Sequence, residues 1–252
     1  MNSDWRLNIV MPMAGLGSRF RQAGFQIPKP LIEVRGRPMY AWATESLPLE
    51  KSTRLIFILL ASQPEFPDLK RDIEQRYANH NPIVLTVPEL TAGQAITVLR
   101  AREFIHLDEP LLIHNADTAF DIDPTWVENA WVEKLDGALL VFPSMEKRWS
   151  FSRANAAGFV EEVREKEAVS PWASTGTYWF RRGLDFVNAA EARFHSGKLE
   201  ASEFYVGPLY NDLLVRGAKV KNFPIRKLYC FGTPEDLNVT LNNLKTEGIN
   251  LV

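Results

Sequence analysis

Residues 8–20 read NIVMPMAGLGSRF, an apolar run that passes directly into a glycine-rich turn. The run is brief and rich in Ile, Val and Met, which is typical of a buried β-strand. Gly15 and Gly17 let the backbone of the turn approach a ligand closely, and the N–H groups of such a turn can bind phosphate oxygens. The stretch therefore predicts a phosphate-binding turn at the carboxyl end of a strand.

Short apolar runs, each followed by a longer segment with helical spacing, recur after this stretch. The alternation predicts an α/β fold with a Rossmann-like, mostly parallel mixed sheet flanked by helices, arranged in three layers, α/β/α. Sheets of this kind bind ligands at the carboxyl ends of their strands. The expected strands are residues 7–13, 55–61, 83–87, 111–114 and 138–143, and the expected helices are residues 39–47, 66–77, 93–104 and 124–134.

The second half of the chain has strands with a different pattern, since residues 158–164 alternate apolar with charged side chains. No repeat, low-complexity tract or long linker separates the two halves. We therefore expect a single domain over residues 1–252 in which both halves share one sheet. The further expected strands are residues 158–164, 173–180 and, as the last strand, 219–225; the further expected helices are residues 183–194, 204–215 and 234–245.

Composition and charge exclude several classes of protein. The 29 Lys and Arg nearly balance the 31 Asp and Glu, so the chain lacks the basic field that recruits nucleic acid. Cys230 is the only cysteine, which excludes an internal disulfide and fits a reducing compartment. No apolar stretch approaches the roughly 20 residues that span a bilayer, and the first residues lack a signal pattern. We expect a cytoplasmic protein without a nucleic-acid or membrane partner.

The glycine-rich turn alone is also compatible with an ordinary loop or with a dinucleotide site. A dinucleotide fingerprint needs Gly or Ala where Phe20 stands, so a nicotinamide-dependent oxidoreductase, which would bind NAD(P), rests on residues 15–20 alone. The kinase-type loop lacks its Gly-Lys-Ser/Thr ending. Residues 27–31, IPKPL, strengthen the phosphate interpretation, because two prolines restrain the backbone around Lys29. Arg19 can fork onto pyrophosphate oxygens while Lys29 places a charge on the phosphoryl group under attack.

Gly15-Leu16-Gly17-Ser18-Arg19, followed by Pro28-Lys29-Pro30, resembles the signature of the sugar-phosphate nucleotidyltransferases, also called sugar-nucleotide pyrophosphorylases. The resemblance covers nearly the whole chain. It implies an enzyme that transfers the nucleoside monophosphate part of an NTP to a phosphorylated acceptor, with Mg²⁺ as cofactor and pyrophosphate as leaving group. Its further motifs are residues 111–117 (LLIHNAD), 163–166 (VREK), 174–178 (STGTY) and 231–237 (FGTPEDL).

The resemblance also implies an NTP-binding half, about residues 1–145, and an acceptor-binding half, about residues 146–252. Asp117 corresponds to the family's Mg²⁺ ligand, and a carboxylate at the end of an apolar strand is poorly solvated unless it is paired or bound to a cation. Arg19 and Lys29 are the expected catalytic residues. The expected nucleotide-binding residues are Ala14, Gly15, Gly17, Ser18, Gly93 and Gln94, and the expected acceptor-binding residues are Glu165, Lys166, Thr175 and Gly176.

Some of these residues have a plain structural alternative. Lys166 lies in a charged run, where a solvated lysine is the usual reading without the resemblance. Gln94 could read a base edge through its amide, but a simple helix start at Thr91 explains the same segment. For Asp117 the alternative is a turn or cap residue, a role better suited to Asp121 or Asp123.

One departure from the family pattern concerns the metal site. Better-known members carry a second aspartate two residues before the Gly-Thr of the late turn, and here that position is Cys230. Asp236 lies beyond the turn and is not its equivalent. Cys230 is therefore the main support for an alternative, a non-catalytic module that binds a nucleotide or sugar phosphate.

The acceptor is the largest open point. The family suggests a sugar 1-phosphate and a product used in polysaccharide or cell-surface glycan assembly, while compact relatives accept other phosphates, including those used by cytidylyltransferases. The residues also leave open the base of the NTP and the number of subunits, a homo-oligomer included.

Overall fold

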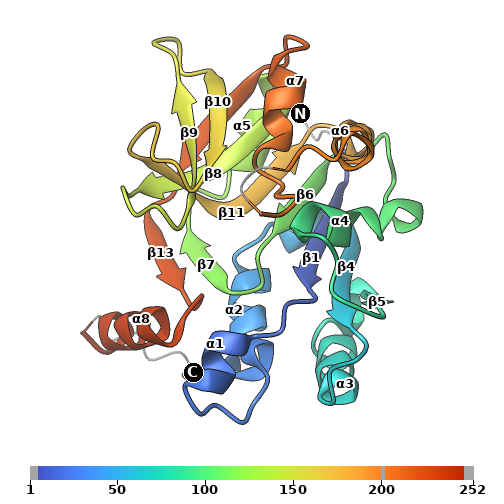
Figure 1. Ribbon diagram of the computed structural model, residues 1–252, viewed down its shortest axis with the longest axis vertical. Coiled ribbons are helices and arrows are strands. Elements are labelled where there is room, and N and C mark those ends of the chain that lie inside the picture. Colours follow the sequence, from blue (N-terminus) through green and yellow to red (C-terminus); the bar gives the residue numbers. More distant parts are fainter. Residues whose placement is uncertain (1–4, 200–201, 247–252) are drawn as a thin grey trace.

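The computed structural model describes residues 5–199 and 202–246 (Figure 1). Its main sheet has nine strands, in the order β10-β9-β11-β6-β1-β4-β5, with β8 and β12 attached through β11. The strands are β1 (Leu7–Met13), β4 (Ser52–Leu60), β5 (Ile83–Val87), β6 (Leu111–His114), β8 (Gly137–Pro143), β9 (Ser150–Ala154), β10 (Val160–Glu165), β11 (Trp172–Phe180) and β12 (Val220–Pro224).

The strands of the first half form a parallel ladder. β1 lies between β4 and β6, and Val10 stands opposite both Ile56 and Ile113. β11 then runs antiparallel to β6, β8 and β9, whereas β12 is parallel to β8. The predicted mixed α/β sheet is therefore confirmed, with its parallel part at the centre and its antiparallel part built from the second half.

Helices cover both faces of the sheet. The side chains of β1 alternate between two cores, since Val10 packs into one while Ile9 and Met11 pack into the other. Helices α4 (Gln94–Leu99), α6 (Gly183–Ser196) and α7 (Leu209–Leu214) cover the first core, and α2 (Met39–Glu45), α3 (Phe66–Arg76) and α5 (Trp126–Val132) cover the second. Within the described residues, every helix is too short or too polar to cross a bilayer.

A third apolar cluster lies at the end of the molecule where α1 and α8 are found in Figure 1. Phe20 from α1 (Ser18–Gln22), Leu237 from α8 (Pro234–Thr246) and Phe231 are buried together. Two small ladders that are separate from the main sheet contribute side chains to this cluster, β7 (Thr118–Asp121) with β13 (Lys227–Cys230) and β2 (Glu33–Val34) with β3 (Arg37–Pro38). The late turn at residues 231–233 is thereby held beside the end of β6.

Two predicted helices are shorter than expected. The helix predicted over residues 93–104 ends at Leu99, where hydrogen bonds from residue i to i−3 tighten the last turn, and a 3-10 turn, Arg102–Phe104, follows. The apolar spacing continues through this break because Ala101 and Ile105 are also buried. The helix predicted over residues 204–215 begins at Leu209, since Phe204 forms backbone bonds with Ala92 and Ala95 instead.

The prediction that residues 219–225 form the last strand is wrong, because β13 follows. The sequence pattern also does not predict β2, β3, β7 and β9. β7 begins four residues after the end of β6, in a segment whose sequence resembles a loop, and its strand partner is β13, which lies about 110 residues later. Short strands of this kind depend on a distant partner and carry little local signal.

Candidate active site

The turn after β1 packs directly against Lys29. Gly17 has a φ of 62°, a left-handed conformation that glycine adopts without strain, and a Cβ at this position would lie 3.1 Å from Cβ of Lys29. Gln63 donates a hydrogen bond of 2.9 Å to the Gly15 carbonyl and holds the turn from the side of β4. The missing side chain at Gly17 therefore lets the glycine-rich turn and the proline-flanked lysine approach each other.

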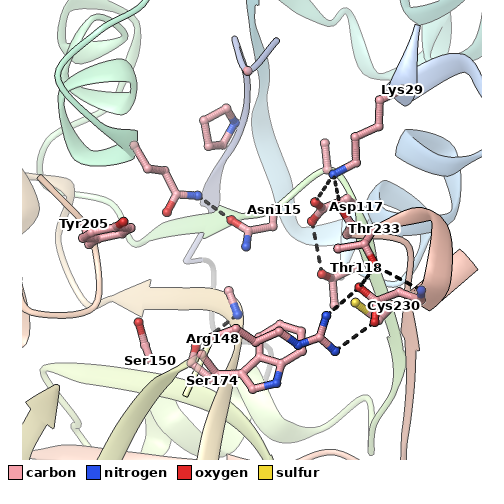
Figure 2. A pocket seen from close by; sticks show the side chains of 18 of the residues that line it. Lys29, Asn115, Asp117, Thr118, Arg148, Ser150, Ser174, Tyr205, Cys230 and Thr233 are labelled. Carbon is pink, nitrogen blue, oxygen red and sulfur yellow. Dashed lines mark hydrogen bonds and ion pairs between the residues drawn. The ribbon is translucent and has the colours of Figure 1, made fainter. Parts of the chain in front are cut away.

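Lys29 joins three segments that are far apart in the sequence. It begins a short 3-10 helix, Lys29–Leu31, and its Nζ lies 2.5 Å from Oδ2 of Asp117. The same ammonium donates to the Gly232 carbonyl at 3.1 Å. Figure 2 shows the Lys29 side chain descending onto Asp117 at the wall of a cavity. The prolines on either side restrict the backbone, so little entropy is lost when the ammonium is held in this direction.

Asp117 is ionised in this environment. Burial opposes its ionisation, but the charge of Lys29, the hydrogen bond from Lys29 and the hydroxyl of Thr118 together hold the pKa of this carboxyl below its usual value. Its side chain is 30% exposed, so the carboxylate remains accessible from the cavity. The strand end thus presents a negative charge next to a positive one, within reach of a ligand.

A magnesium ion fits the residues around Asp117. A Cβ on Gly232 would lie 3.3 Å from Oδ2 of Asp236 and 3.9 Å from Oδ2 of Asp117, so the missing side chain leaves a cradle open between two carboxylates. Burial raises the pKa of the Cys230 thiol to about 12, which keeps it protonated and unsuited to a hard cation. Mg²⁺ commonly binds one or two carboxylates together with substrate phosphates. Within residues 5–199 and 202–246, no three acidic, His or Cys side chains gather as a metal-binding set.

Asp236 differs from its expected place, because the sequence analysis set it apart from the site and the structure puts it in the cavity wall. Its carboxylate accepts from the Thr233 hydroxyl at 2.9 Å, while the Asp236 N–H donates back to that hydroxyl at 3.1 Å. This reciprocal pair caps the first turn of α8. Arg148 also donates to both oxygens of Asp236, which leaves this carboxylate less available to a metal ion. That Asp236 does not replace the missing aspartate as a metal ligand stays a prediction.

His114 is the last residue of β6, and its buried side chain stabilises the segment that carries Asp117. The side chain is fully buried; its Nε2 lies 2.7 Å from the Thr118 carbonyl and its Nδ1 lies 2.8 Å from the Thr177 hydroxyl. The carbonyl can only accept, so Nε2 carries the proton and Nδ1 accepts from Thr177. These bonds hold the backbone on both sides of Asp117. Burial lowers the pKa of His114 to about 4, so the ring is neutral at pH 7.

The buried imidazole predicts a loss of stability in mild acid. The unfolded chain protonates His114 near pH 6.5, whereas the folded protein does so only near pH 4. The unfolded state therefore binds more protons between these values, and the free energy of unfolding falls as the pH decreases from 6.5 to 4. The shift corresponds to roughly 3 kcal/mol. Urea unfolding at several pH values measures this slope, and His114→Gln should flatten it; equal slopes in both proteins contradict the assignment.

The two faces of β11 divide the predicted acceptor motif. Ser174, Gly176 and Tyr178 line the cavity, as expected for alternate residues of a strand. Thr175 points to the other side, where it is fully buried and its hydroxyl lies 3.2 Å from the Leu140 carbonyl. The prediction that Thr175 binds the acceptor is therefore corrected, because the strand phase brings Ser174 to the cavity in its place.

Gly176 makes room for an amide pair at the centre of the cavity. Its φ is 80°, and a Cβ there would lie 2.0 Å from Nδ2 of Asn115. The Gln94 amide donates a hydrogen bond to Oδ1 of Asn115, and both residues line the cavity. Gln94 thus faces the cavity, as expected, with an oxygen still able to accept and with Asn115 as a partner that the sequence analysis missed.

Glu165 and Lys166 stand at the end of β10. The Ser150 hydroxyl donates to Glu165, and the Lys166 ammonium donates to the Tyr205 hydroxyl at 2.8 Å. This hydrogen bond is the main reason that the pKa of Lys166 is raised, so the side chain stays charged. Lys166 has a φ of 59°, an uncommon left-handed conformation for a lysine. Strain of this kind is often retained where a side chain must point in one direction.

The cavity brings most of the predicted residues together. It encloses about 500 Å³, within the usual range of ligand sites. Ala14, Ser18 and Gly93 do not line it; Gly93 instead packs against the Phe204 backbone at the start of α4. The predicted residues on the wall are Gly15, Gly17, Arg19, Lys29, Gln94, Asp117, Glu165, Lys166 and Gly176, and the residues that the sequence analysis missed include Asn115, Arg148, Trp149, Ser150, Ser174 and Tyr205.

The family model for nucleotidyl transferases matches residues 8–206, which is most of the chain. The chain belongs to the nucleotidyl transferase family. The match includes the glycine-rich turn, Lys29, Asp117 and the acceptor-side strands, so the nucleotidyltransferase predicted from sequence is confirmed as to family. No curated protein sequence matches the chain significantly.

Several solved structures share the fold. The nucleoside-diphosphate-sugar pyrophosphorylase of Vibrio cholerae RC9 is 28% identical, has a TM-score of 0.81, and the match covers 93% of this chain and 99% of that one. The inositol-1-phosphate CTP transferase of T. maritima is 15% identical with a TM-score of 0.75, over 100% of both chains. A UDP-glucose pyrophosphorylase of Acinetobacter baumannii is 15% identical with a TM-score of 0.73, over 98% and 95%. The last two likenesses concern the fold alone.

Proposed function

We propose that this nucleotidyltransferase joins the nucleoside monophosphate part of an NTP to a sugar 1-phosphate and releases pyrophosphate. The observation that carries the proposal is the convergence of Arg19, Lys29, Asp117 and Lys166 on one cavity. The 28% identity to a nucleoside-diphosphate-sugar pyrophosphorylase supports a sugar phosphate as acceptor. An acceptor of another kind, such as the inositol phosphate in the name of the T. maritima neighbour, is the alternative.

The proposed reaction is an in-line displacement at the α-phosphorus. An oxygen of the acceptor phosphate forms a bond to the α-phosphorus, and the bond from that phosphorus to the oxygen bridging to the β-phosphate breaks. The acceptor phosphate is already anionic near neutral pH, so little base catalysis is needed. The protein must instead align two anions and neutralise the charge that develops on the leaving group.

The four residues divide this task. Arg19 forks onto the departing pyrophosphate, Lys29 stabilises the α-phosphoryl oxygens, and Lys166 holds the acceptor phosphate. Asp117 would hold Mg²⁺, which when bound supplies positive charge to phosphate oxygens. The half of about residues 1–145 contributes the turn, Lys29 and Asp117, and the half of about 146–252 contributes Glu165 and Lys166. We therefore assign NTP binding to the first half and acceptor binding to the second, within one domain.

The product would be a nucleoside-diphosphate sugar for polysaccharide or glycan assembly, made in the cytoplasm where NTPs are available. The direct test is pyrophosphate release from each NTP with a panel of sugar 1-phosphates and other phosphate monoesters, with and without Mg²⁺. Release that needs both an acceptor and Mg²⁺ supports the proposal. Tight binding of an NTP or sugar phosphate without any release would instead support the regulatory module that Cys230 suggested.

Replacing Lys166 by glycine should separate acceptor binding from stability. Glycine adopts the left-handed backbone of residue 166 without strain, which stabilises the folded state. Its larger conformational entropy stabilises the unfolded state by a similar amount. The free energy of unfolding should therefore change by less than about 1 kcal/mol. Loss of a charged hydrogen bond should raise the KM for the acceptor about 10- to 100-fold. Steady-state kinetics and thermal unfolding measure the two effects. Lys166→Asn, which also tolerates this backbone, should behave alike; an unchanged acceptor KM in both variants refutes the role.

A further inference from the structure

Arg148 is a positively charged residue of the cavity wall that has no role in the reaction proposed above. It lies between β8 and β9, with its guanidinium 4.5 Å from the Trp149 ring, and its side chain is 42% exposed. Figure 2 shows this side chain stretched along the cavity floor, with the guanidinium beside Thr118 and Cys230. It therefore lies between the acceptor side of the cavity and the end of β6.

The guanidinium is held in one orientation by carboxylates behind it. Its two terminal nitrogens donate to the two oxygens of Asp236 at 2.7 and 2.8 Å, and its Nε donates to Glu146 at 2.8 Å. The Asp236 side chain is only 11% exposed and is itself fixed by Thr233. A paired, planar arrangement of this kind gives Arg a defined direction that a flexible lysine lacks.

Two of its donors remain for a ligand. A guanidinium has five N–H groups, and the described partners of Arg148, Asp236 and Glu146, accept three of them. The charge is also available, because the guanidinium is always protonated and the Arg148 side chain is 42% exposed. The cavity side of Arg148 can thus donate to an anion without breaking the pair with Asp236.

Arg148 and Lys166 project from the same end of one hairpin. β9 and β10 pair antiparallel with Ser150 opposite Glu165, and the Lys166 N–H donates to the Trp149 carbonyl at 2.9 Å. The residues just before β9 and just after β10 are therefore neighbours, and both side chains line the cavity. A phosphate monoester carries close to two negative charges near neutral pH, which suits two cations better than one.

We propose that Arg148 and Lys166 together bind the phosphate of the acceptor, with Asp236 as the positioning residue that fixes the guanidinium. The inference rests on the proposed function, since it names a further binding residue for the same acceptor. It also explains the capped and buried carboxylate at the start of α8, which acts on the substrate through Arg148.

Calorimetric titration with methyl phosphate tests the pair without requiring turnover. Arg148→Gln and Lys166→Gln should each raise the Kd for methyl phosphate about tenfold, the loss expected for one charged hydrogen bond. The matched control is Arg153→Gln, because Arg153 lies on β9 but pairs with Glu161 and Glu162 outside the cavity. Its Kd should equal that of the unaltered protein. A Kd within twofold of the unaltered value in Arg148→Gln overturns the proposal, as does failure of the unaltered protein to bind methyl phosphate.

Kinetics with the best acceptor then separates positioning from structure. Asp236→Asn should raise the KM for the acceptor and leave the KM for the NTP unchanged, whereas general damage to the fold would change both; equal rises in the two KM values overturn the positioning role. Weaker methyl phosphate binding in the variants, combined with no pyrophosphate release by the unaltered protein, supports the pair and refutes the proposed transfer. Turnover by the unaltered protein, combined with an unchanged acceptor KM in Arg148→Gln, supports the proposed transfer and overturns the pairing of Arg148 with Lys166.

Discussion

Lys29→Ala should lower kcat on the order of 10²- to 10³-fold, the usual loss when one preorganised charge at a reacting phosphoryl group is removed. The side chain is directed by two prolines and by the bond to Asp117, so the remaining cations cannot move into its place. Arg19 lies on the glycine-rich turn and Lys166 at the end of β10, and each has a separate part in the proposed reaction. The loss should appear in kcat, which is measured with both the NTP and the acceptor at saturating concentration.

Initial rates of pyrophosphate release measure this effect. Lys70→Ala is the matched control, because Lys70 lies on α3 outside the cavity, with a 44% exposed side chain that pairs with Glu74 along the helix. Thermal unfolding should show that Lys29→Ala is folded, although Asp117 loses its partner and burial then raises its pKa. Turnover near the normal rate would remove Lys29 from the mechanism.

The fold could be predicted from sequence where strands are continuous apolar runs. β1, β5 and β6 begin and end as expected, because their runs are rich in apolar side chains and are bounded by turn residues. β7 and β13 could not be found in this way, since their short runs include polar side chains and each pairs with the other across about 110 residues of chain. The helix expected at residue 204 failed for a related reason, because Phe204 bonds to the segment around Gly93.

The site residues likewise differ in whether local sequence or a distant partner determines their place. Lys29 and Asp117 follow from local motifs, the first from its flanking prolines and the second from its place at a strand end. The motif predicts Thr175 as a ligand where the structure has Ser174 on the cavity wall, because a motif does not reveal which face of a strand meets the cavity. Arg148 was missed because its partner, Asp236, is 88 residues away. A basic residue just before a strand that pairs with the strand carrying Glu165 is the signal that could have identified it.

The structure changes the interpretation of Cys230, which stands where better-known members of the family carry an aspartate. Along the sequence, Cys230 removes a carboxylate from the expected metal site. In the structure the protonated thiol lies 3.6 Å from the position that a Cβ on Gly232 would occupy, between Asp117 and Asp236. An aspartate at residue 230 would add a third carboxylate beside Asp117 and Asp236, whose charges are balanced by Lys29 and Arg148 respectively. The thiol thus fits a site whose second carboxylate is already engaged by an arginine.

Asp117→Asn should lower kcat by a factor on the order of 10² to 10³ and raise the Mg²⁺ concentration for half-maximal activity at least about tenfold. The amide keeps the shape of the carboxylate, and its oxygen can still accept the hydrogen bond from Lys29. What it loses is the negative charge that a hard divalent cation requires. Titration of pyrophosphate release with Mg²⁺ measures the shift, and calorimetric titration with Mg²⁺ in the presence of pyrophosphate measures binding directly.

Asp121→Asn is the control for this change, because Asp121 is an exposed acid at the end of β7 and should leave both values unaltered. A double-mutant cycle with Lys29→Ala then identifies what Asp117 does. If Asp117 only positions Lys29, the double variant should be as slow as Lys29→Ala alone, since the second change removes nothing further. If Asp117 also holds the metal, the double variant should be slower still and should need more Mg²⁺ than Lys29→Ala. We expect the second result, because the Asp117 side chain is 30% exposed and its carboxylate therefore remains accessible from the cavity beside its bond to Lys29.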